Sequence, residues 1–154
     1  MPIGKNKQNG FTMIELLIAL LILAVGLFGM ASLMMTSMKS NQSAAMRSQA
    51  SWLAYDIVER MRLNSTIATS SDRYVITAAA VAPADPGCKA NGCSPNNVAV
   101  LDLNEWKTQL GQAALAGSVA RAGNAYTIVI SWLEDSSTAC GVANQCSFTL
   151  RADL

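Results

Sequence analysis

Apolar residues dominate one continuous stretch near the start of the chain, residues 11–35. Its 25 residues carry a single charged side chain, Glu15, and contain no proline. About 20 apolar helical residues are enough to cross the hydrocarbon core of a bilayer. The pattern therefore predicts a membrane-spanning helix. A carboxylate inside such a helix is costly, which makes Glu15 a candidate functional residue.

Beyond residue 35 the pattern changes from uniformly apolar to amphipathic. Between residues 36 and 64, apolar side chains recur at steps of three and four, the spacing that places them on one face of a helix. They are Met46, Ala50, Leu53, Ile57 and Met61, with Ala54 and Val58 beside them. Nothing interrupts the pattern, so we expect one helix from Phe11 to about Leu63. Asn64 and Ser65 indicate its end.

Charged side chains lie along the amphipathic half of this helix, at Asp56, Glu59, Arg60 and Arg62. Asp56 and Arg60 have the i,i+4 spacing of an intrahelical ion pair, which is worth a few tenths of a kcal/mol. The four residues have two interpretations. They form either a strip that docks a partner protein or a solvated helix face tied by intrahelical pairs.

Residues 65–114 combine loops with one helix. A short apolar run occupies Tyr74–Val81, and a loop rich in Pro, Gly, Asn and Cys occupies Pro83–Asn97. The prolines there argue against a long element. Asp102 is followed after three residues by Glu105, the spacing of a capping box. This predicts a helix from Leu103 to about Ala114 that buries Trp106 and Leu110 and is closed by Gly117.

The last third of the chain predicts a small antiparallel sheet. Ser118–Ala122 and Tyr126–Leu133 read as strands around a Gly123-Asn124 turn, because β-branched and aromatic residues alternate with polar ones. A polar loop at Glu134–Gln145 leads to a final strand at Ser147–Ala152. We expect this sheet to pack on the amphipathic half of the helix. Trp52 and Trp132 are expected to be core or domain-packing aromatics.

Composition excludes several classes of function. The 154 residues suffice for one domain, and the net charge of +1 leaves no basic patch for nucleic acid. The chain has no His, the commonest general base and metal ligand. No nucleophile motif, phosphate-binding loop or CxxC pair occurs. The sequence therefore predicts a protein that is not an enzyme and that has no cofactor and no metal.

Four cysteines form two closely spaced pairs, Cys88 with Cys93 and Cys140 with Cys146. Their spacings are longer than the usual closest pair of a zinc site. An oxidising compartment outside the cytoplasm favours disulfides. Four cysteines allow three connectivities, among which sequence cannot choose rigorously. Local pairing, Cys88–Cys93 and Cys140–Cys146, is the expectation, and zinc is the alternative.

A short basic leader with Lys5 and Lys7 ends in Gly10-Phe11, and Glu15 follows four residues later. This arrangement resembles the class III signal of type IV pilins and pseudopilins. The resemblance implies that prepilin peptidase cuts between Gly10 and Phe11 and N-methylates Phe11. The lysines also hold the leader in the cytoplasm. An ordinary secretory signal and a plain single-span anchor are the alternatives.

After such a cut, Phe11 carries a cationic amine at the tip of an apolar helix. A second subunit, shifted along a filament, would place Glu15 beside that amine. An unpaired charge buried in an apolar bundle costs far more than a matched pair. Glu15 is therefore expected to act in assembly by setting the register between subunits.

Two further stretches, Val25–Leu33 and Arg47–Asn64, resemble the PilV-type minor pilins, also called pilus modification proteins. The resemblance implies an α+β pilin fold with a long N-terminal helix on a small antiparallel sheet. It divides the chain into a cleaved leader, a transmembrane and assembly half of the helix, an amphipathic half and a periplasmic globular domain. These segments are residues 1–10, 11–35, 36–64 and 65–154.

The implied function is that of a minor pilin that primes type IV pilus assembly, within a complex at the fibre tip. Implied partners are prepilin peptidase, other minor pilins, the major pilin, the inner-membrane assembly platform and, before assembly, membrane lipid. The protein would sit in the inner membrane with a cytoplasmic N-terminus and later in the fibre. A minor pseudopilin of a type II secretion system is the alternative. A membrane-anchored periplasmic enzyme or binding domain is an alternative from another class.

Overall fold

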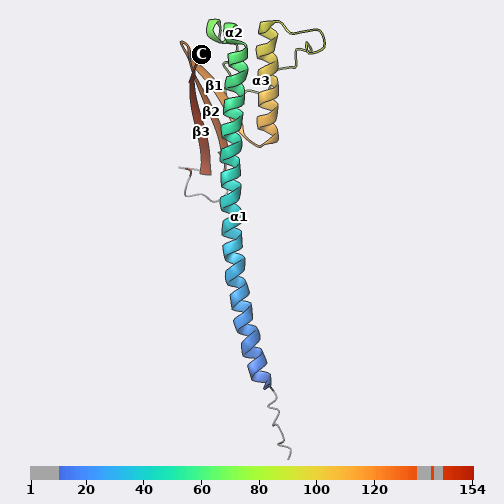
Figure 1. The fold of residues 1–154 in the computed structure, drawn as a ribbon, viewed down its shortest axis with the longest axis vertical. Coiled ribbons are helices and arrows are strands. Elements are labelled where there is room, and N and C mark those ends of the chain that lie inside the picture. The colour runs from blue at the N-terminus through green and yellow to red at the C-terminus, as the bar shows by residue number, and fades with distance from the viewer. Residues whose placement is uncertain (1–10, 135–139, 141–143) are drawn as a thin grey trace, which may run out of the picture. The chain divides into compact units, whose positions relative to one another are not determined.

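The computed structural model describes residues 11–134, 140 and 144–154. Its elements, in chain order, are α1 (Met13–Leu63), α2 (Ser65–Ser70), α3 (Pro95–Gln112), β1 (Ala116–Ala122), β2 (Ala125–Leu133) and β3 (Gln145–Asp153) (Figure 1). A long N-terminal helix and a small antiparallel sheet confirm the predicted α+β fold class. The chain divides into two compact units, one ending at Gln42 and the other comprising Ser43–Leu154.

The first unit contains the apolar part of α1. The helix begins at Met13, where the backbone oxygen of Thr12 accepts a hydrogen bond from the Glu15 N–H at 3.1 Å. All large apolar side chains from Met13 to Met38 are exposed. Among the described residues, α1 is the one helix that is long and apolar enough to cross a membrane. None of the residues in its most apolar stretch is buried. The predicted apolar stretch thus forms a helix whose apolar side chains are not packed against other residues of the first unit.

The second unit has its core on the amphipathic half of α1. The predicted stripe is confirmed, because six of its seven residues are buried and Met46 is partly buried. The buried ones are Ala50, Leu53, Ala54, Ile57, Val58 and Met61. From α3, Trp106 is fully buried and donates its indole N–H to the Leu53 carbonyl oxygen at 2.9 Å. This contact holds α3 beside α1 (Figure 1).

The sheet has three antiparallel strands in the order β1-β2-β3. The three predicted strands are confirmed, with ends that differ by at most two residues. Gly123 adopts a φ of +64° in the predicted turn, a conformation that glycine reaches without steric cost. Alternate residues of β2 are buried, and Trp132 is among them, which confirms it as a core aromatic.

The predicted start of the helix α3 is wrong. The helix begins at Pro95, because the Ser94 hydroxyl accepts a hydrogen bond from the Asn97 N–H at 3.3 Å and Pro95 occupies the first turn. Proline is favoured there, since the missing N–H needs no partner. Asp102 is therefore no cap but a buried residue inside α3.

The predicted end of α3, about Ala114, is confirmed to within two residues, but the residue predicted to close the helix is wrong. The helix ends at Gln112, and Ala114 takes a left-handed φ of 55°. Gly117 does not close the helix but lies inside β1. A Cβ atom at Gly117 would stand 2.6 Å from Leu110 Cδ1 and 2.7 Å from Trp106 Cη2. Glycine is required here because α3 packs directly on the strand.

The apolar run Tyr74–Val81 meets the sheet through a one-residue bridge between Ile76 and Val119. Two further expectations need correction. Ser65–Ser70 forms a short helix, α2, where turns were expected. Trp52 is not a core residue, because it is 61% exposed. At 100° per residue, Trp52 is turned about 100° from Leu53 and lies on nearly the opposite side of the helix from the centre of the buried stripe.

Candidate assembly and processing site

The first turn of α1 carries the residues of the predicted processing and assembly site. Gly10 lies outside the described residues. Phe11 is 78% exposed, and Glu15 lies in the first turn, where the partial positive charge of a helix N-terminus favours a carboxylate. Among the ion pairs of the described residues, none involves Glu15. The structure therefore presents an apolar helix tip with one acidic side chain that forms no ion pair with another described residue.

A polar network in the second unit ties α1 to α3 through Arg60. Its Nε bonds Asp56 at 2.9 Å, while Nη1 reaches Glu105 at 2.7 Å and Asp102 at 3.3 Å. The side chain is 22% exposed. Burial alone would lower the pKa of Arg60, but the hydrogen bonds to the carboxylates outweigh it and raise the pKa. Arg60 stays charged and joins both helices.

Tyr74 connects this network to the segment before α3. Its hydroxyl donates to Asp102 Oδ2 at 2.6 Å and accepts a hydrogen bond from the Asn64 amide at 3.1 Å. The same amide group donates to the Pro95 carbonyl oxygen at 2.8 Å. Burial, together with the bond to Asp102, raises the pKa of Tyr74. The end of α1 is thus joined to the start of α3 by a partly buried hydrogen bond and, through Tyr74, to Asp102 by buried ones.

The four charged residues predicted as either a docking strip or a solvated helix face, Asp56, Glu59, Arg60 and Arg62, form two separate groups. The predicted Asp56–Arg60 pair is present, but Arg60 also bonds Asp102 and Glu105 of α3 and is therefore not free to dock a partner protein. Glu59 and Arg62 form a separate pair at 2.6 Å, with both side chains more than half exposed. Sequence reasoning missed Asp102 and Tyr74 as members of a network. Asp102 lies 28 residues from Tyr74 and 42 residues from Arg60, so no local pattern connects these three residues.

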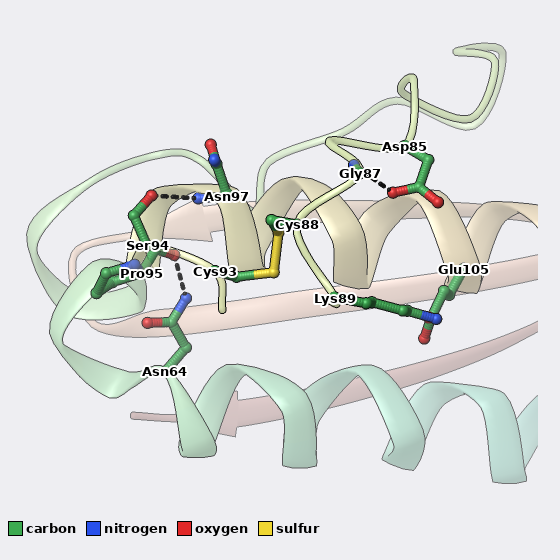
Figure 2. Close-up of a disulfide and its surroundings, with 10 residues drawn as sticks. All are labelled: Asn64, Asp85, Gly87, Cys88, Lys89, Cys93, Ser94, Pro95, Asn97 and Glu105. Carbon is green, nitrogen blue, oxygen red and sulfur yellow. Dashed lines mark hydrogen bonds and ion pairs between the residues drawn. A yellow bond between two sulfur atoms is a disulfide. The ribbon is translucent and has the colours of Figure 1, made fainter. Parts of the chain in front are cut away.

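The disulfide between Cys88 and Cys93 lies in the loop before α3 (Figure 2). Their Cα atoms are 5.0 Å apart. Within this loop the Lys89 ammonium meets Glu105 Oε1 at 2.5 Å. Hydrogen bonds from Lys89 and then from Arg60 lower the pKa of Glu105. The loop is therefore attached to the same carboxylate that holds Arg60.

A second disulfide joins Cys140 and Cys146, with Cα atoms 4.8 Å apart. The Glu134 carboxylate approaches it, with Oε2 2.9 Å from Cys146 Sγ and 3.5 Å from Cys140 Sγ. These three residues are the one group in the described part of the chain whose spacing would suit a metal ion. Metal binding needs thiolates. Because the sulfurs of Cys140 and Cys146 are joined in a disulfide, they cannot act as thiolate ligands.

Comparison with known families agrees with this geometry. Residues 5–31 match the family model of the prokaryotic N-terminal methylation motif, which covers the predicted cleavage point and Glu15. The chain thus falls in the class of proteins that begin with a methylation motif and an apolar helix. Residues 32–104, which include Arg60, Tyr74 and Asp102, match the family model described as type IV pilin Tt1218. Over these two stretches, which together span residues 5–104, the chain is similar to type IV pilins.

No curated protein and no solved structure matches the chain.

Proposed function

We propose that the chain is a type IV pilin and, within that family, a minor pilin that primes pilus assembly, after prepilin peptidase cuts between Gly10 and Phe11 and N-methylates Phe11. The observation that carries the proposal is the methylation motif, residues 5–31, which runs into an apolar, exposed helix with Glu15 in its first turn. Such a surface is stable in lipid or among the same helices of other subunits.

The priming role rests on the resemblance of Val25–Leu33 and Arg47–Asn64 to PilV-type minor pilins. In this proposal the subunit waits in the inner membrane, with a cytoplasmic N-terminus and a periplasmic globular domain. It then joins other minor pilins and the major pilin at the fibre tip, with the help of the assembly platform. The matched family is one of structural pilins and not of enzymes. We therefore expect this protein to have a structural role.

Deletion of the gene tests the proposal. Surface pili and twitching motility should fall sharply while type II secretion continues. In a strain that cannot retract pili, piliation should partly return, because a priming defect changes the balance of assembly and retraction without abolishing polymerisation. Complementation with the wild-type gene is the control. Normal piliation with a secreted protein retained in the periplasm would instead identify a minor pseudopilin.

A further inference from the structure

A small ring closed by a disulfide precedes α3, and it contains a reactive pair of residues. The ring runs from Cys88 to Cys93 (Figure 2), and within it Asn91 is followed by Gly92. The chain has one other Asn-Gly pair, Asn9-Gly10, which lies in the leader and outside the described residues. Every other asparagine is followed by a residue that has a Cβ atom. Because glycine has no Cβ, its backbone nitrogen can approach the preceding side chain closely.

The surroundings of Asn91 leave both reacting groups accessible. Asn91 and Gly92 are exposed, and the Asn91 N–H donates to the Cys88 carbonyl oxygen at 3.3 Å, which closes a turn. No described residue forms a hydrogen bond with the Asn91 side chain or with the Gly92 N–H. Gly92 has a φ of 84°, a conformation that favours glycine. The turn therefore requires the residue that makes Asn91 reactive.

Other asparagines of the described residues lack this combination. The buried Asn64 amide donates two hydrogen bonds, which hold it in place. Asn104 lies inside α3, where the N–H of the following residue bonds to a carbonyl group one turn earlier. Asn124 is the closest comparison, because it is exposed in the turn between β1 and β2 but is followed by Ala125.

We propose that Asn91 deamidates by itself in the intact protein. The Gly92 nitrogen gives its proton to water or hydroxide and attacks the Asn91 Cγ atom. The bond from Cγ to Nδ2 breaks, Nδ2 takes up a proton and leaves as ammonia, and a succinimide ring remains. Water then opens this ring. Breaking the new bond to Cγ gives aspartate, whereas breaking the bond from the Gly92 nitrogen to the Asn91 carbonyl carbon gives isoaspartate.

The product differs from asparagine in charge and in backbone length. An aspartate or isoaspartate carboxyl group is ionised at neutral pH, so the loop gains a negative charge. This charge lies two residues from Lys89, whose ammonium meets Glu105 Oε1 at 2.5 Å. In isoaspartate the backbone also runs through Cβ and Cγ, which enlarges the ring. The reaction therefore changes the loop that Lys89 attaches to α3.

Peptide mapping tests the proposal on the full chain, purified in detergent and incubated without reductant at neutral and at mildly alkaline pH. The peptide that contains Asn91 should gain the mass difference between an amide and an acid and separate into aspartate and isoaspartate forms. It should react faster at the higher pH, because the attacking nitrogen must lose its proton. An exposed loop that opens at almost no cost should react within about tenfold of the rate in the guanidinium-unfolded chain.

The Asn124 peptide is the internal control and should keep its amide over the same time. Asn91→Gln is the matched variant, because it retains the amide but adds a methylene, so that attack must close a larger and less favourable ring. Its peptide should stay unchanged. The proposal is overturned if the Asn91 peptide keeps its amide as long as the Asn124 peptide does, or if Asn91→Gln reacts as fast as wild type. A rate in the folded chain more than about tenfold below that of the unfolded chain also overturns it, because the fold then protects Asn91.

Discussion

Glu15 stands alone as a charge among the exposed side chains of residues 11–38. The helix N-terminus favours its carboxylate, but that effect is at most about 1 kcal/mol at an exposed site. Burial among apolar helices costs several times more unless a cation is present. The N-terminal amine of a neighbouring subunit is the cation that the proposed cleavage before Phe11 would create.

Glu15→Gln should therefore leave membrane insertion and cleavage unchanged but weaken incorporation into the fibre. The substitution keeps the shape of the side chain and removes its charge. Crosslinking to partner pilins in membranes, followed by immunoblotting, measures the effect. Glu59→Gln is the control, because Glu59 is an exposed carboxylate outside the first turn. Equal crosslinking of both variants and wild type would show that Glu15 has no role in assembly.

Because of Tyr74, we expect the stability of the folded protein to depend on pH. Its pKa is raised in the folded protein, so the native state holds the phenol proton more tightly than the unfolded chain, where the pKa is about 10. Its stabilising contribution is full below about pH 10 and is lost as the pH rises towards the folded pKa. The free energy of unfolding can be measured by urea titrations at a series of pH values. It should fall as the pH rises above about 10.

Tyr74→Phe should make this alkaline loss smaller. It will not remove it, because burial also raises the pKa of Tyr126. Tyr55→Phe, at an exposed tyrosine, should leave the profile unchanged. Parallel profiles for wild type and Tyr74→Phe would mean that Tyr74 is not the group responsible.

At the scale of elements, α3 meets β1 without space between them at Gly117. Gly117→Ala should cost about 1–3 kcal/mol, because its Cβ would overlap Leu110 and Trp106, two buried side chains. Gly111→Ala is the matched control. Apart from the neighbouring residues and the backbone of α3 itself, nothing lies within 4 Å of a Cβ there, and alanine stabilises a helix by up to about 1 kcal/mol over glycine. Urea unfolding of both variants should show opposite signs, and equal values would contradict this packing.

The two disulfides each close a short loop, one before α3 and one before β3. Non-reducing peptide mapping should recover Cys88 linked to Cys93 and Cys140 linked to Cys146. Replacing Cys88 and Cys93 together by serine should lower the free energy of unfolding by about 2 kcal/mol on the chain-entropy account. Peptides that link one pair to the other would refute the connectivity, and bound zinc in the purified protein would refute the chemistry.

At the scale of the whole molecule, we expect the chain to be cleaved and methylated at its N-terminus. In cells that contain prepilin peptidase, intact-mass spectrometry of membrane fractions should find a chain that starts at N-methylated Phe11. Cells without the peptidase should retain the full leader and serve as the control. A mature N-terminus near Gly26, or an uncut chain in competent cells, would contradict the proposed processing.

The sequence by itself determined the features that depend on neighbouring residues. Apolar side chains at helical spacing from Met46 to Met61 predicted the buried stripe of α1, and alternation in Tyr126–Leu133 predicted β2. The Gly123-Asn124 turn followed from the backbone freedom of glycine. The start of α3 was also within reach, because Ser94-Pro95 is a local signal for a helix N-terminus.

Only the tertiary structure decided which distant groups meet. Asp102 has the spacing of a cap, yet α3 starts earlier and Asp102 turns to Tyr74 and Arg60. Trp52 has the chemistry of a core residue, yet its direction on α1 leaves it exposed at the edge of a cleft. Periodicity says which face of a helix is apolar. Which side chains cover that face, and where the cover stops, depends on packing between segments that lie far apart in the chain.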